Sequence, residues 1–413
     1  MDIIVQKYGG TSVADVEKIK NVARRVIRTK KEGNSVVVVV SALGDTTDNL
    51  LKMAHKITPS PPERELDMLL ATGEQVSVAL LAMAIEALGH QAISFTGLQV
   101  GILTDAAHTK AKIIDVKSER ILKELEKGKI VIVAGFQGVT VDSDITTLGR
   151  GGSDTTAVAL AAKLKADTCE IYTDVEGVFT ADPQIAPDAR KISVISYDEM
   201  LEMSATGAKV IQLRAVEYGK NYRVTIHVRS SFLDEPGTII KEADEMLERP
   251  IISGVTYDVG EAKVTILDVP DKPGIAAKVF KALADRNVNV DMIIQNVSEK
   301  GFTDISFTVV GEDLNKAKTV MERIVKELGA RGITCDEEIA KVSLIGAGMK
   351  SHPGVASDMF SALAENDINI EMISTSAIKI SCVIHESNVE KAVRAIHEKF
   401  NLGKEQIREV VGE

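Results

Sequence analysis

Residues 147–156 read TLGRGGSDTT and place three glycines, Arg150, Ser153 and Asp154 directly before the apolar helical run 157–164. Glycine carries no Cβ, so backbone amides in such a turn can approach an anion closely. A helix that starts there adds unpaired N–H groups and the positive end of its dipole. Ser153 or Asp154 would cap this helix, and Arg150 can grip a carboxylate or phosphate with two parallel hydrogen bonds. Taken alone, the stretch fits an anion site and an ordinary capped turn equally well.

The composition predicts a soluble chain of two or three domains, because 413 residues exceed the size of one hydrophobic core. A net charge of -11 argues against nucleic-acid and anionic-membrane partners. There is no leader before residue 3 and no apolar run that approaches a membrane span, so we expect a cytoplasmic protein. Cys169, Cys335 and Cys382 are far apart and the histidines are scattered, so we expect no metal site built from them.

Short apolar runs alternate with helical patterns through about residue 230, which predicts an α/β domain with an open, mostly parallel sheet. Residues 36–40 are five valines, typical of a strand buried on both faces. The run 3–7 ends at Lys7, just before the Gly9-Gly10 turn. Open α/β sheets bind ligands at the carboxyl ends of their strands. Lys7 and the glycine amides can hold phosphates there, although a solvated lysine at a strand end is the more common arrangement.

Polar side chains also follow other predicted strand ends. The hydroxyl-rich turn 41–47 follows the valine strand, and Thr173 and Asp174 end the strand 170–174. Glu74 lies at a helix start, where an acidic side chain either complements the helix dipole or receives a substrate ammonium group. These positions predict a polar ligand at the carboxyl edge of the sheet.

The C-terminal part of the chain contains an internal repeat after a predicted linker at 234–249. Pro273-Gly274 recurs as Pro353-Gly354 after 80 residues, and Asn289 recurs as Asn369 in the same register. Each copy reads as strand, turn, amphipathic helix, strand, then a further strand and helix. This is the βαββαβ pattern of a ferredoxin-like module.

Three stretches taken together resemble the aspartate kinase family: 7–13 (KYGGTSV), 149–154 (GRGGSD) and 172–183 (YTDVEGVFTADP). The resemblance covers the whole chain, because monofunctional members end in two ACT-type regulatory modules. It implies an open, mostly parallel sheet of the amino-acid kinase type, followed by two ferredoxin-like ACT modules. The expected boundaries are 1–245 for the catalytic domain, 262–337 for the first module, and 246–261 plus 338–413 for the second, whose early strand precedes the inserted first module.

The resemblance implies transfer of the ATP γ-phosphoryl group to the β-carboxylate of L-aspartate, with Mg²⁺ carried by ATP. Lys7 and Asp154 would be catalytic, with Asp154 orienting Lys7. The implied aspartate site has Glu74 on the ammonium group and Arg150 on the α-carboxylate, and comprises Ser41, Thr47, Glu74, Arg150, Gly151, Gly152 and Ser153. The implied ATP site comprises Lys7, Tyr8, Gly9, Gly10, Ser41, Thr173, Asp174, Phe179, Thr180, Ala181, Asp182, Pro183 and Lys209.

The resemblance also implies that lysine, threonine or both act as inhibitory effectors at module interfaces. A Pro-Gly turn that opens a helix exposes N–H groups to an effector carboxylate, but it also serves as a plain turn in a dimer-forming module. We expect at least a homodimer, or a heterotetramer with a short subunit started at Met246. The candidate effector residues are Asp271, Pro273, Gly274, Ile275, Ala276, Asn289 and Gln295 in the first copy, and Pro353, Gly354, Val355, Ala356, Asn369, Ile370 and Ser376 in the second.

Three alternatives stay open from the sequence. One is another kinase of the same family that acts on acetylglutamate or glutamate, and one is an amino-acid-binding regulatory protein with an inactive kinase domain. The third is a dehydrogenase, suggested by Gly346-Ala347-Gly348, but Ser351 replaces the third glycine of the dinucleotide fingerprint.

Overall fold

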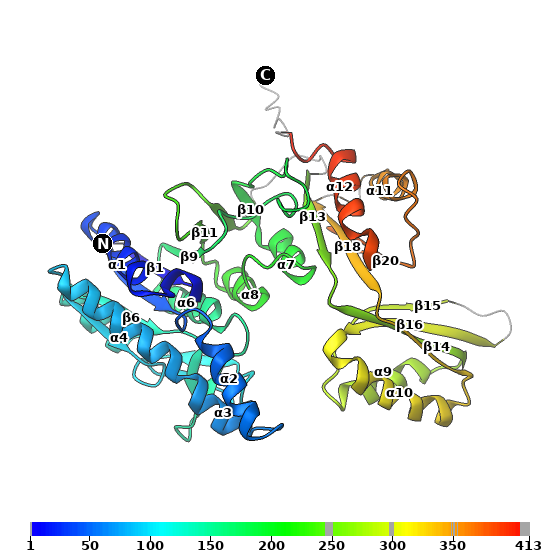
Figure 1. Ribbon diagram of the computed structural model, residues 1–413, viewed down its shortest axis with the longest axis horizontal. Coiled ribbons are helices and arrows are strands. Elements are labelled where there is room, and N and C mark those ends of the chain that lie inside the picture. Colours follow the sequence, from blue (N-terminus) through cyan, green and yellow to red (C-terminus); the bar gives the residue numbers. More distant parts are fainter. Residues whose placement is uncertain are drawn as a thin grey trace. The chain divides into compact units, whose positions relative to one another are not determined.

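The computed structural model describes residues 2–243, 251–296, 301–347, 349, 352 and 354–404, and it divides into two compact units (Figure 1). The first unit contains Met1–Phe179 and Lys191–Leu247, and the second contains Thr180–Arg190 and Glu248–Glu413. Two predicted positions, Pro353 and Met246, lie outside the described residues.

The first unit is built on an eight-stranded sheet. Among the described strands, adjacent pairs run parallel except the β11–β12 pair. The predicted mostly parallel sheet is confirmed. In spatial order the strands are β10 (Val194–Ser196), β12 (Thr238–Lys241), β11 (Ile226–Ser230), β9 (Thr168–Thr173), β1 (Ile3–Tyr8), β2 (Ser35–Val40), β6 (Ile130–Ala134) and β3 (Ala92–Phe95).

Helices cover both faces of this sheet, which explains why the valine strand β2 is buried along its whole length. Val36, Val38 and Val40 pack with α1 (Val16–Lys31) and α4 (Thr72–Ala87) in one core cluster. On strand β2 alternate side chains point to opposite faces, so Val37 and Val39 face the side of α6. The remaining helices of this unit are η1 (Gly10–Val13), α2 (Thr46–Ile57), α3 (Glu63–Leu70), α5 (Glu119–Glu126), α6 (Gly152–Leu164), α7 (Tyr197–Ala205) and α8 (Leu213–Tyr222).

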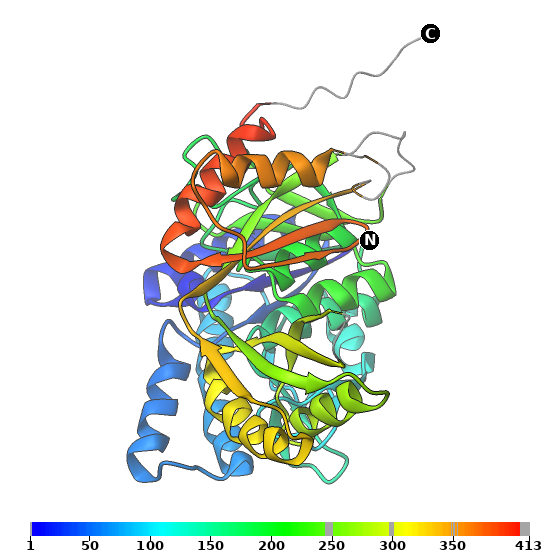
Figure 2. The same cartoon turned by 90° about the vertical axis from the view of Figure 1, so that its right-hand side faces the viewer.

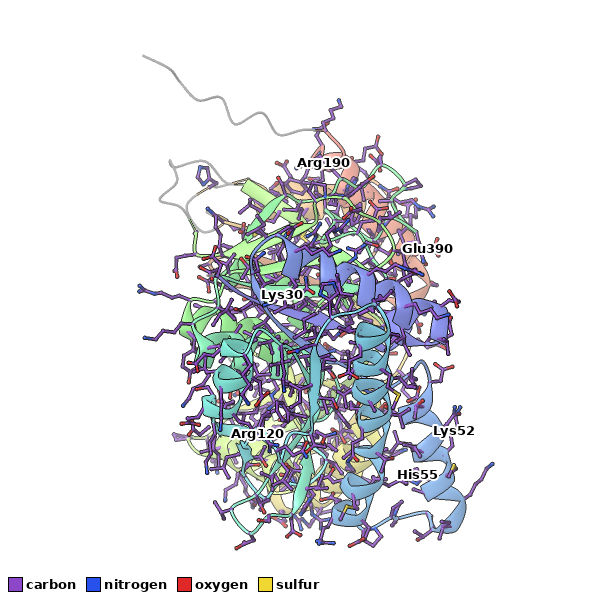
Figure 3. All side chains as sticks on the ribbon, turned by 90° about the vertical axis from the view of Figure 1, so that its left-hand side faces the viewer. Lys30, Lys52, His55, Arg120, Arg190 and Glu390 are labelled. Carbon is purple, nitrogen blue, oxygen red and sulfur yellow. The ribbon has the colours of Figure 1, made fainter. Side chains whose placement is uncertain are left out.

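Helix α2 is the most peripheral of these elements, since Ala54 is its one buried residue. Lys52 and His55 project from it into solvent in Figure 3. Helices α3 and α4 together, Glu63–Ala87, have the length and apolar composition of a membrane span, which the sequence analysis did not anticipate. Val78, Leu81 and Ile85 of α4 pack into the core beneath the sheet. Packing in the core accounts for only part of this apolar content, because Met68, Val76 and Met83 are exposed.

A second, smaller sheet of the first unit was not predicted. Its strand order is β5 (Ile113–Val116), β4 (Ile102–Thr104), β7 (Gln137–Val139) and β8 (Ile145–Thr147). Strand β8 leads directly into the glycine-rich turn at 149–151. These strands have only three or four residues each, too short for a periodicity of 2 to stand out.

The predicted linker at 234–249 is wrong in its first part. Residues 234–237 form the connection between β11 and β12, and β12 continues the central sheet. Gly237 is required there, because a Cβ at this position would lie 1.7 Å from the carbonyl oxygen of Val228. A Pro-Gly pair between two apolar runs marked a hairpin here.

The first repeat copy forms the βαββαβ module that the sequence predicts. Its sheet has the order β15-β16-β14-β17, and adjacent strands run antiparallel. Figure 2 shows its two helices together on one face of the sheet, where they bury a continuous apolar core. The elements are β14 (Glu261–Pro270), α9 (Ile275–Ala284), β15 (Val290–Gln295), β16 (Phe302–Val310), η2 (Gly311–Asp313), α10 (Leu314–Leu328) and β17 (Gly332–Asp336).

The second module has the same architecture but a different connectivity. Its sheet order is β13-β18-β20-β19, and β13 pairs antiparallel with β18. Strand β13 precedes the first module in sequence, so the first module lies between two strands of the second. The elements are β13 (Ile251–Asp258), β18 (Ile339–Ala347), α11 (Val355–Ala364), β19 (Met372–Thr375), β20 (Lys379–His385), η3 (Glu386–Asn388) and α12 (Val389–Lys399).

The segment Thr180–Arg190 also belongs to the second unit, although its flanking residues pair with each other in the first unit. Ala181, Ile185 and Ala186 lie in the apolar core of the second module. The backbone N–H of Val255 on β13 donates to the Thr180 carbonyl at 2.8 Å. The segment is thus a structural part of the second module.

Candidate active site

An ion pair between Lys7 and Asp154 lies at the carboxyl end of the central sheet. Lys7 is next to the last residue of β1, and Asp154 lies in the first turn of α6. Lys7 Nζ is 2.6 Å from Asp154 Oδ1, and their side chains are 12% and 9% exposed. A Cβ at Gly9 would lie 3.5 Å from this ammonium group, so Gly9 keeps one side of Lys7 open. The predicted link between these residues is present.

The glycine-rich turn starts α6 in a different way from the one expected. The N-cap is Gly151, with φ of 68°, and no side chain caps the helix. Ser153 and Asp154 lie inside the first turn, so the prediction that one of them caps the helix is wrong. A Cβ at Gly151 would lie 1.6 Å from Cγ of Gln212, so no larger residue fits between the turn and the start of α8. The N–H groups of Gly152, Asp154 and Thr155 donate to the Gly149 and Gly151 carbonyls at 3.0 to 3.2 Å, so the turn itself satisfies most of the first turn of α6.

Arg150 is exposed on this turn and forms no ion pair or hydrogen bond with the residues that the structure describes. Arg214 holds the backbone on the N-terminal side of this turn. Arg214 at the start of α8 donates from Nη1 to the Leu148 carbonyl at 2.7 Å and from Nη2 to the Ala111 carbonyl at 3.1 Å. The turn is therefore fixed while the Arg150 guanidinium stays unpaired, an arrangement suited to an anionic ligand.

Glu74 is a buried carboxylate whose second oxygen has no partner. Its side chain is 2% exposed, and Oε1 accepts a hydrogen bond from the Ala42 N–H at 3.1 Å. Oε2 is buried and unpaired among the described residues. Burial raises the pKa of Glu74 to about 7, although the Ala42 N–H lowers it in part. An unpaired buried carboxylate is costly unless a ligand supplies the missing donor.

Backbone hydrogen bonds tie the turn after β1 to the turn after β2, which begins at Ser41 and leads to Thr47 in the first turn of α2. The Gly44 N–H donates to the Gly10 carbonyl at 3.1 Å, and the Ser41 N–H donates to the Tyr8 carbonyl at 3.1 Å. Ser41 and Thr47 are half-buried. A Cβ at Gly10 would lie 3.0 Å from the Ala42 carbonyl oxygen, so this contact needs glycine.

The predicted ATP residues fall into separate places. Thr173 ends β9, next to β1, and Asp174 follows it, whereas Lys209 is exposed between α7 and α8. The Tyr8 side chain is fully buried and stacks on Tyr172 with ring centroids 4.7 Å apart. A ligand at this edge can therefore contact only the Tyr8 backbone, and the place of Tyr8 in the ATP site stays a prediction.

The predicted ATP loop 179–183 is divided between the two units. Phe179 is half-buried in the first unit, where it forms a β-bridge with Lys191. Thr180, Ala181, Asp182 and Pro183 belong to the second unit. The Thr180 hydroxyl is 3.0 Å from His397 Nε2, and the Tyr257 hydroxyl donates to Asp182 Oδ2 at 3.0 Å.

The predicted effector residues occupy equivalent, largely exposed places in the two modules. Gly274 with φ of 91° and Gly354 with φ of 117° precede α9 and α11. Asn289 directly precedes the edge strand β15, Gln295 is its last residue, and Ser376 directly follows the edge strand β19. The other described candidates lie in the same turns and first helical turns, or beside the edge strands: Asp271, Pro273, Ile275, Ala276, Val355, Ala356, Asn369 and Ile370.

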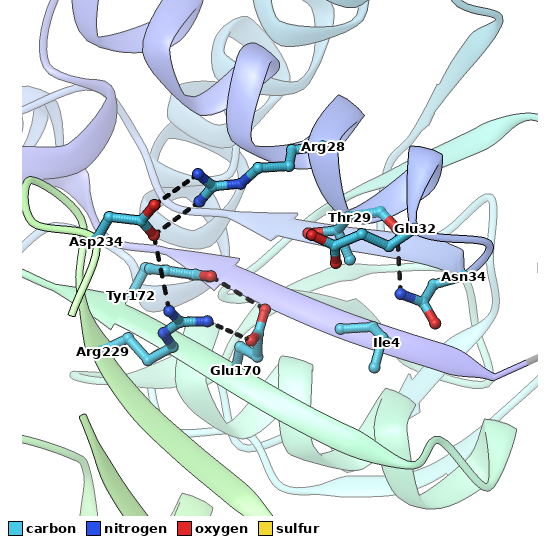
Figure 4. Close-up of a pocket in the computed structure, with 9 residues that line it drawn as sticks. All are labelled: Ile4, Arg28, Thr29, Glu32, Asn34, Glu170, Tyr172, Arg229 and Asp234. Carbon is cyan, nitrogen blue, oxygen red and sulfur yellow. Dashed lines mark hydrogen bonds and ion pairs between the residues drawn. The ribbon is translucent and has the colours of Figure 1, made fainter. Parts of the chain in front are cut away.

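A pocket of about 330 Å³ lies elsewhere, on the α1 side of the central sheet (Figure 4). Four of its charged groups pair with one another: Arg28 forms two hydrogen bonds with Asp234, and Glu170 accepts from Arg229 and from the Tyr172 hydroxyl. None of the predicted site residues lines it. Among the described residues, no group of three or more His, Cys, Asp or Glu side chains could hold a metal ion.

Sequence reasoning missed several residues that support the site, among them Ala42, Gln212 and Arg214. Ala42 acts through its backbone, and Gln212 and Arg214 lie about 60 residues after the turn that they contact. None of the three carried a local sequence signal, because the half-burial of Arg214 is visible only in the structure.

Comparison with known proteins gives the same organisation as the structure. Residues 2–230 match the amino acid kinase family, and residues 263–329 and 342–400 each match an ACT domain. The aspartokinase of Mycolicibacterium smegmatis is 57% identical over 408 residues, which cover 98% of this chain and 97% of that protein.

Solved structures are similar over nearly the whole chain. E. coli aspartokinase III in complex with aspartate and ADP matches with a TM-score of 0.82 and 25% identity, covering 96% of this chain and 99% of that chain. The same enzyme in complex with lysine and aspartate matches with a TM-score of 0.74 over the same shares. The mostly parallel sheet and the tandem modules agree with the high sequence identity to aspartokinases over nearly the whole chain. The chain therefore belongs to the aspartokinases of the amino acid kinase family.

Proposed function

We propose that this chain transfers the γ-phosphoryl group of ATP to the β-carboxylate of L-aspartate and releases 4-phospho-L-aspartate. Glu74 carries the proposal, because its buried and unpaired Oε2 calls for a cationic donor from a ligand. Arg150 on the neighbouring turn offers an unpaired guanidinium to a carboxylate. An α-amino acid supplies both partners, and E. coli aspartokinase III, a structural relative, binds aspartate.

In this proposal the two charged ends of aspartate are held by groups of opposite charge. Glu74 accepts the α-ammonium group, and Arg150 clamps the α-carboxylate with two parallel hydrogen bonds. Thr47, Gly151, Gly152 and Ser153 surround the bound amino acid. The β-carboxylate then points toward Ser41 and Lys7, where the two substrates meet.

The phosphates of ATP lie over the turn after β1 in this arrangement. Lys7 and the Gly9 and Gly10 amides hold the phosphates, and Mg²⁺ bound to ATP neutralises part of their charge. Thr173, Asp174, Phe179 and Lys209 of the first unit form the rest of the nucleotide site. Support comes from the place of β1 and β9 as adjacent parallel strands and from the ADP bound to E. coli aspartokinase III.

The chemistry needs no general base, because a carboxylate is already ionised at neutral pH. Phosphoryl transfer depends on alignment and on stabilisation of charge at the moving group. Asp154, 2.6 Å from Lys7 Nζ, fixes the ammonium group at the strand end. The Lys7 ammonium group then stabilises the negative charge that builds on the transferred phosphoryl group. The positive end of the α6 dipole adds to this stabilisation.

The regulatory part of the proposal is feedback inhibition by lysine, threonine or both, which bind at the modules. The reaction takes place in the cytoplasm and is the first step toward lysine, threonine and methionine. E. coli aspartokinase III is a lysine-binding relative. The exposed edge strands β15 and β19 suit pairing of modules, which supports a homo-oligomer, and a short subunit begun at Met246 would contain both modules' repeats.

The test is formation of an acyl phosphate, trapped as the hydroxamate, from ATP, Mg²⁺ and L-aspartate. Parallel reactions with acetylglutamate and glutamate test the other carboxylate kinases, and a Lys7→Ala protein tests for contaminating activity. Product from aspartate alone supports the proposal, whereas product from another acid reassigns the substrate. ATP consumption by none of them would indicate a regulatory protein with an inactive kinase domain.

A further inference from the structure

A fully buried carboxylate, Asp67 on α3, lies beneath the Arg150 turn. Its side chain is 0% exposed. Both carboxylate oxygens accept from the Thr109 N–H, at 3.1 and 3.0 Å, and Oδ1 accepts from the Thr147 hydroxyl at 2.5 Å. His108 Nδ1 lies 2.7 Å from Oδ2. One side chain therefore ties three segments that are far apart in sequence.

Two of these contacts lead directly to the turn that carries Arg150. Thr147 is the last residue of β8, three residues before Arg150, and its carbonyl accepts from the Ala111 N–H at 3.0 Å. Thr109 packs against Gly149, since a Cβ at Gly149 would lie 3.2 Å from the Thr109 carbonyl oxygen. The backbone that leads into the turn, from Thr147 to Gly149, is thus set by groups that Asp67 holds.

Asp67 is also connected to the other end of the proposed amino-acid site. It lies seven residues before Glu74, and Ala71 alone separates α3 from α4. The Ala71 carbonyl accepts from Gln137 Nε2 at 2.9 Å, which fixes the junction between the two helices. The helical frame that positions Glu74 therefore also carries the carboxylate that positions the Arg150 turn.

We infer that Asp67 is a positioning residue that sets the distance between the two clamps for the amino acid, Glu74 and Arg150. This inference rests on the proposed function, because it assumes that the two clamps hold the ammonium and carboxylate groups of one substrate. Asp67 touches no substrate in this scheme. A change at Asp67 should weaken binding of aspartate through a displaced Arg150 and leave the ATP side of the site unaffected.

Asp67→Asn is the first test, because it keeps the size of the side chain but turns one acceptor oxygen into a donor that faces the Thr109 N–H or the Thr147 hydroxyl. We expect KM for aspartate to rise by about tenfold or more, with KM for ATP within about twofold of wild type. Asp115→Asn is the matched control: Asp115 on β5 is 54% exposed and pairs with Lys163 at 2.8 Å. It should leave both KM values unchanged.

If Asp67→Asn does not fold, Thr147→Val and Thr147→Ser still test whether Asp67 positions the Arg150 turn. Thr147→Val removes only the hydroxyl and should raise KM for aspartate, whereas Thr147→Ser retains the hydroxyl and should restore the wild-type value. Equal KM values for the two variants would overturn the inference.

A double-mutant cycle separates positioning from general destabilisation. In an Arg150→Ala background, Asp67→Asn should cause no further rise in KM for aspartate, because the clamp it positions is gone. Full additivity, or an equal rise in KM for ATP, would show that Asp67 only stabilises the fold. Wild-type protein inactive with aspartate would instead refute the proposed function, while an active wild type with an unaffected Asp67→Asn variant refutes the inference alone.

Discussion

The two units place their functional groups in different ways. In the first unit, Lys7, Glu74 and Asp154 are buried or nearly so, and they converge on one edge of a rigid parallel sheet. In the second unit, Gln295, Ser376 and the other candidate effector residues are mostly exposed, on turns and edge strands. Buried charges fix a reaction geometry, whereas exposed turns and edges suit reversible binding and pairing. Changes in the first unit should therefore alter catalysis, and changes in the second should alter inhibition.

The largest effect that this contrast predicts is at Lys7. Lys7→Ala should lower kcat by on the order of 10³-fold, because it removes the one side-chain cation held at the end of β1 by Asp154. Steady-state hydroxamate assays measure it. Lys20→Ala is the control, since Lys20 is exposed and pairs with Glu17 at 2.7 Å on the surface of α1. Retained turnover in Lys7→Ala would remove the phosphate role of this residue.

Arg150→Ala should act on one substrate only. Loss of a charged, bidentate contact costs about 2–3 kcal/mol, or about 30- to 150-fold in KM for aspartate, with little change in KM for ATP. Arg150→Lys should recover part of the loss, because lysine keeps the charge but not the fork geometry. Titration of each substrate at saturation of the other decides the matter, and equal effects on both KM values would contradict the assignment.

Glu74 should make aspartate binding depend on pH. Burial raises its pKa to about 7, and only the ionised form accepts an ammonium group, so KM for aspartate should rise about tenfold between pH 8 and pH 6. A pH profile of kcat/KM measures it. Glu74→Gln should show a flat profile over this range, and an unchanged slope in that variant would assign the titration to another group.

The same pKa shift predicts the effect of Glu74 on stability. Since the folded pKa lies above the value for an unfolded chain, protonation favours the folded protein, and this contribution is lost as pH rises through 7. Glu74→Gln cannot ionise, so its Tm should increase relative to wild type between pH 5 and pH 8 in the absence of aspartate. A Tm difference that is constant with pH would contradict the shift.

The segment Thr180–Arg190 should be an exception to the rule that changes in the second unit alter inhibition and not catalysis. Ile185 is buried in the core of the second module, yet its chain continues into the predicted nucleotide loop. Ile185→Ala should lower Tm, as core truncations do, and also raise KM for ATP several-fold. Ile305→Ala, in the core of the first module, should lower Tm without changing KM for ATP. Equal KM values in the two variants would show that the segment is purely structural.

The smallest effect on activity is expected at the exposed effector positions. Gln295→Ala and Ser376→Ala should change kcat by less than about twofold but should raise the concentration of lysine and threonine needed for inhibition. Inhibition curves with each effector and with both together test this. If both variants are inhibited like the wild type, the edge-strand positions do not form the effector site.

Much of this organisation could be predicted from local patterns. The valine run at 36–40 predicted a strand buried on both faces, and the recurrence of Pro273-Gly274 predicted two modules. The partners of Asp67 could not be predicted, because it contacts residues about 40 and 80 positions away with no local signal. The place of Thr180–Arg190 was also hidden, since its apolar residues fit either unit equally well.

The swapped connectivity of the second module has a further consequence for any shorter form of this protein. A chain that began between the two units would retain β13, and with it every strand of both module sheets. It would lack Thr180–Arg190, so the groove that Ala181, Ile185 and Ala186 fill would be open. The segment Thr180–Arg190, which fills this groove, exists only in the long chain. If the segment of a long chain bound in this groove of a short chain, the contact would stabilise a complex between the two forms.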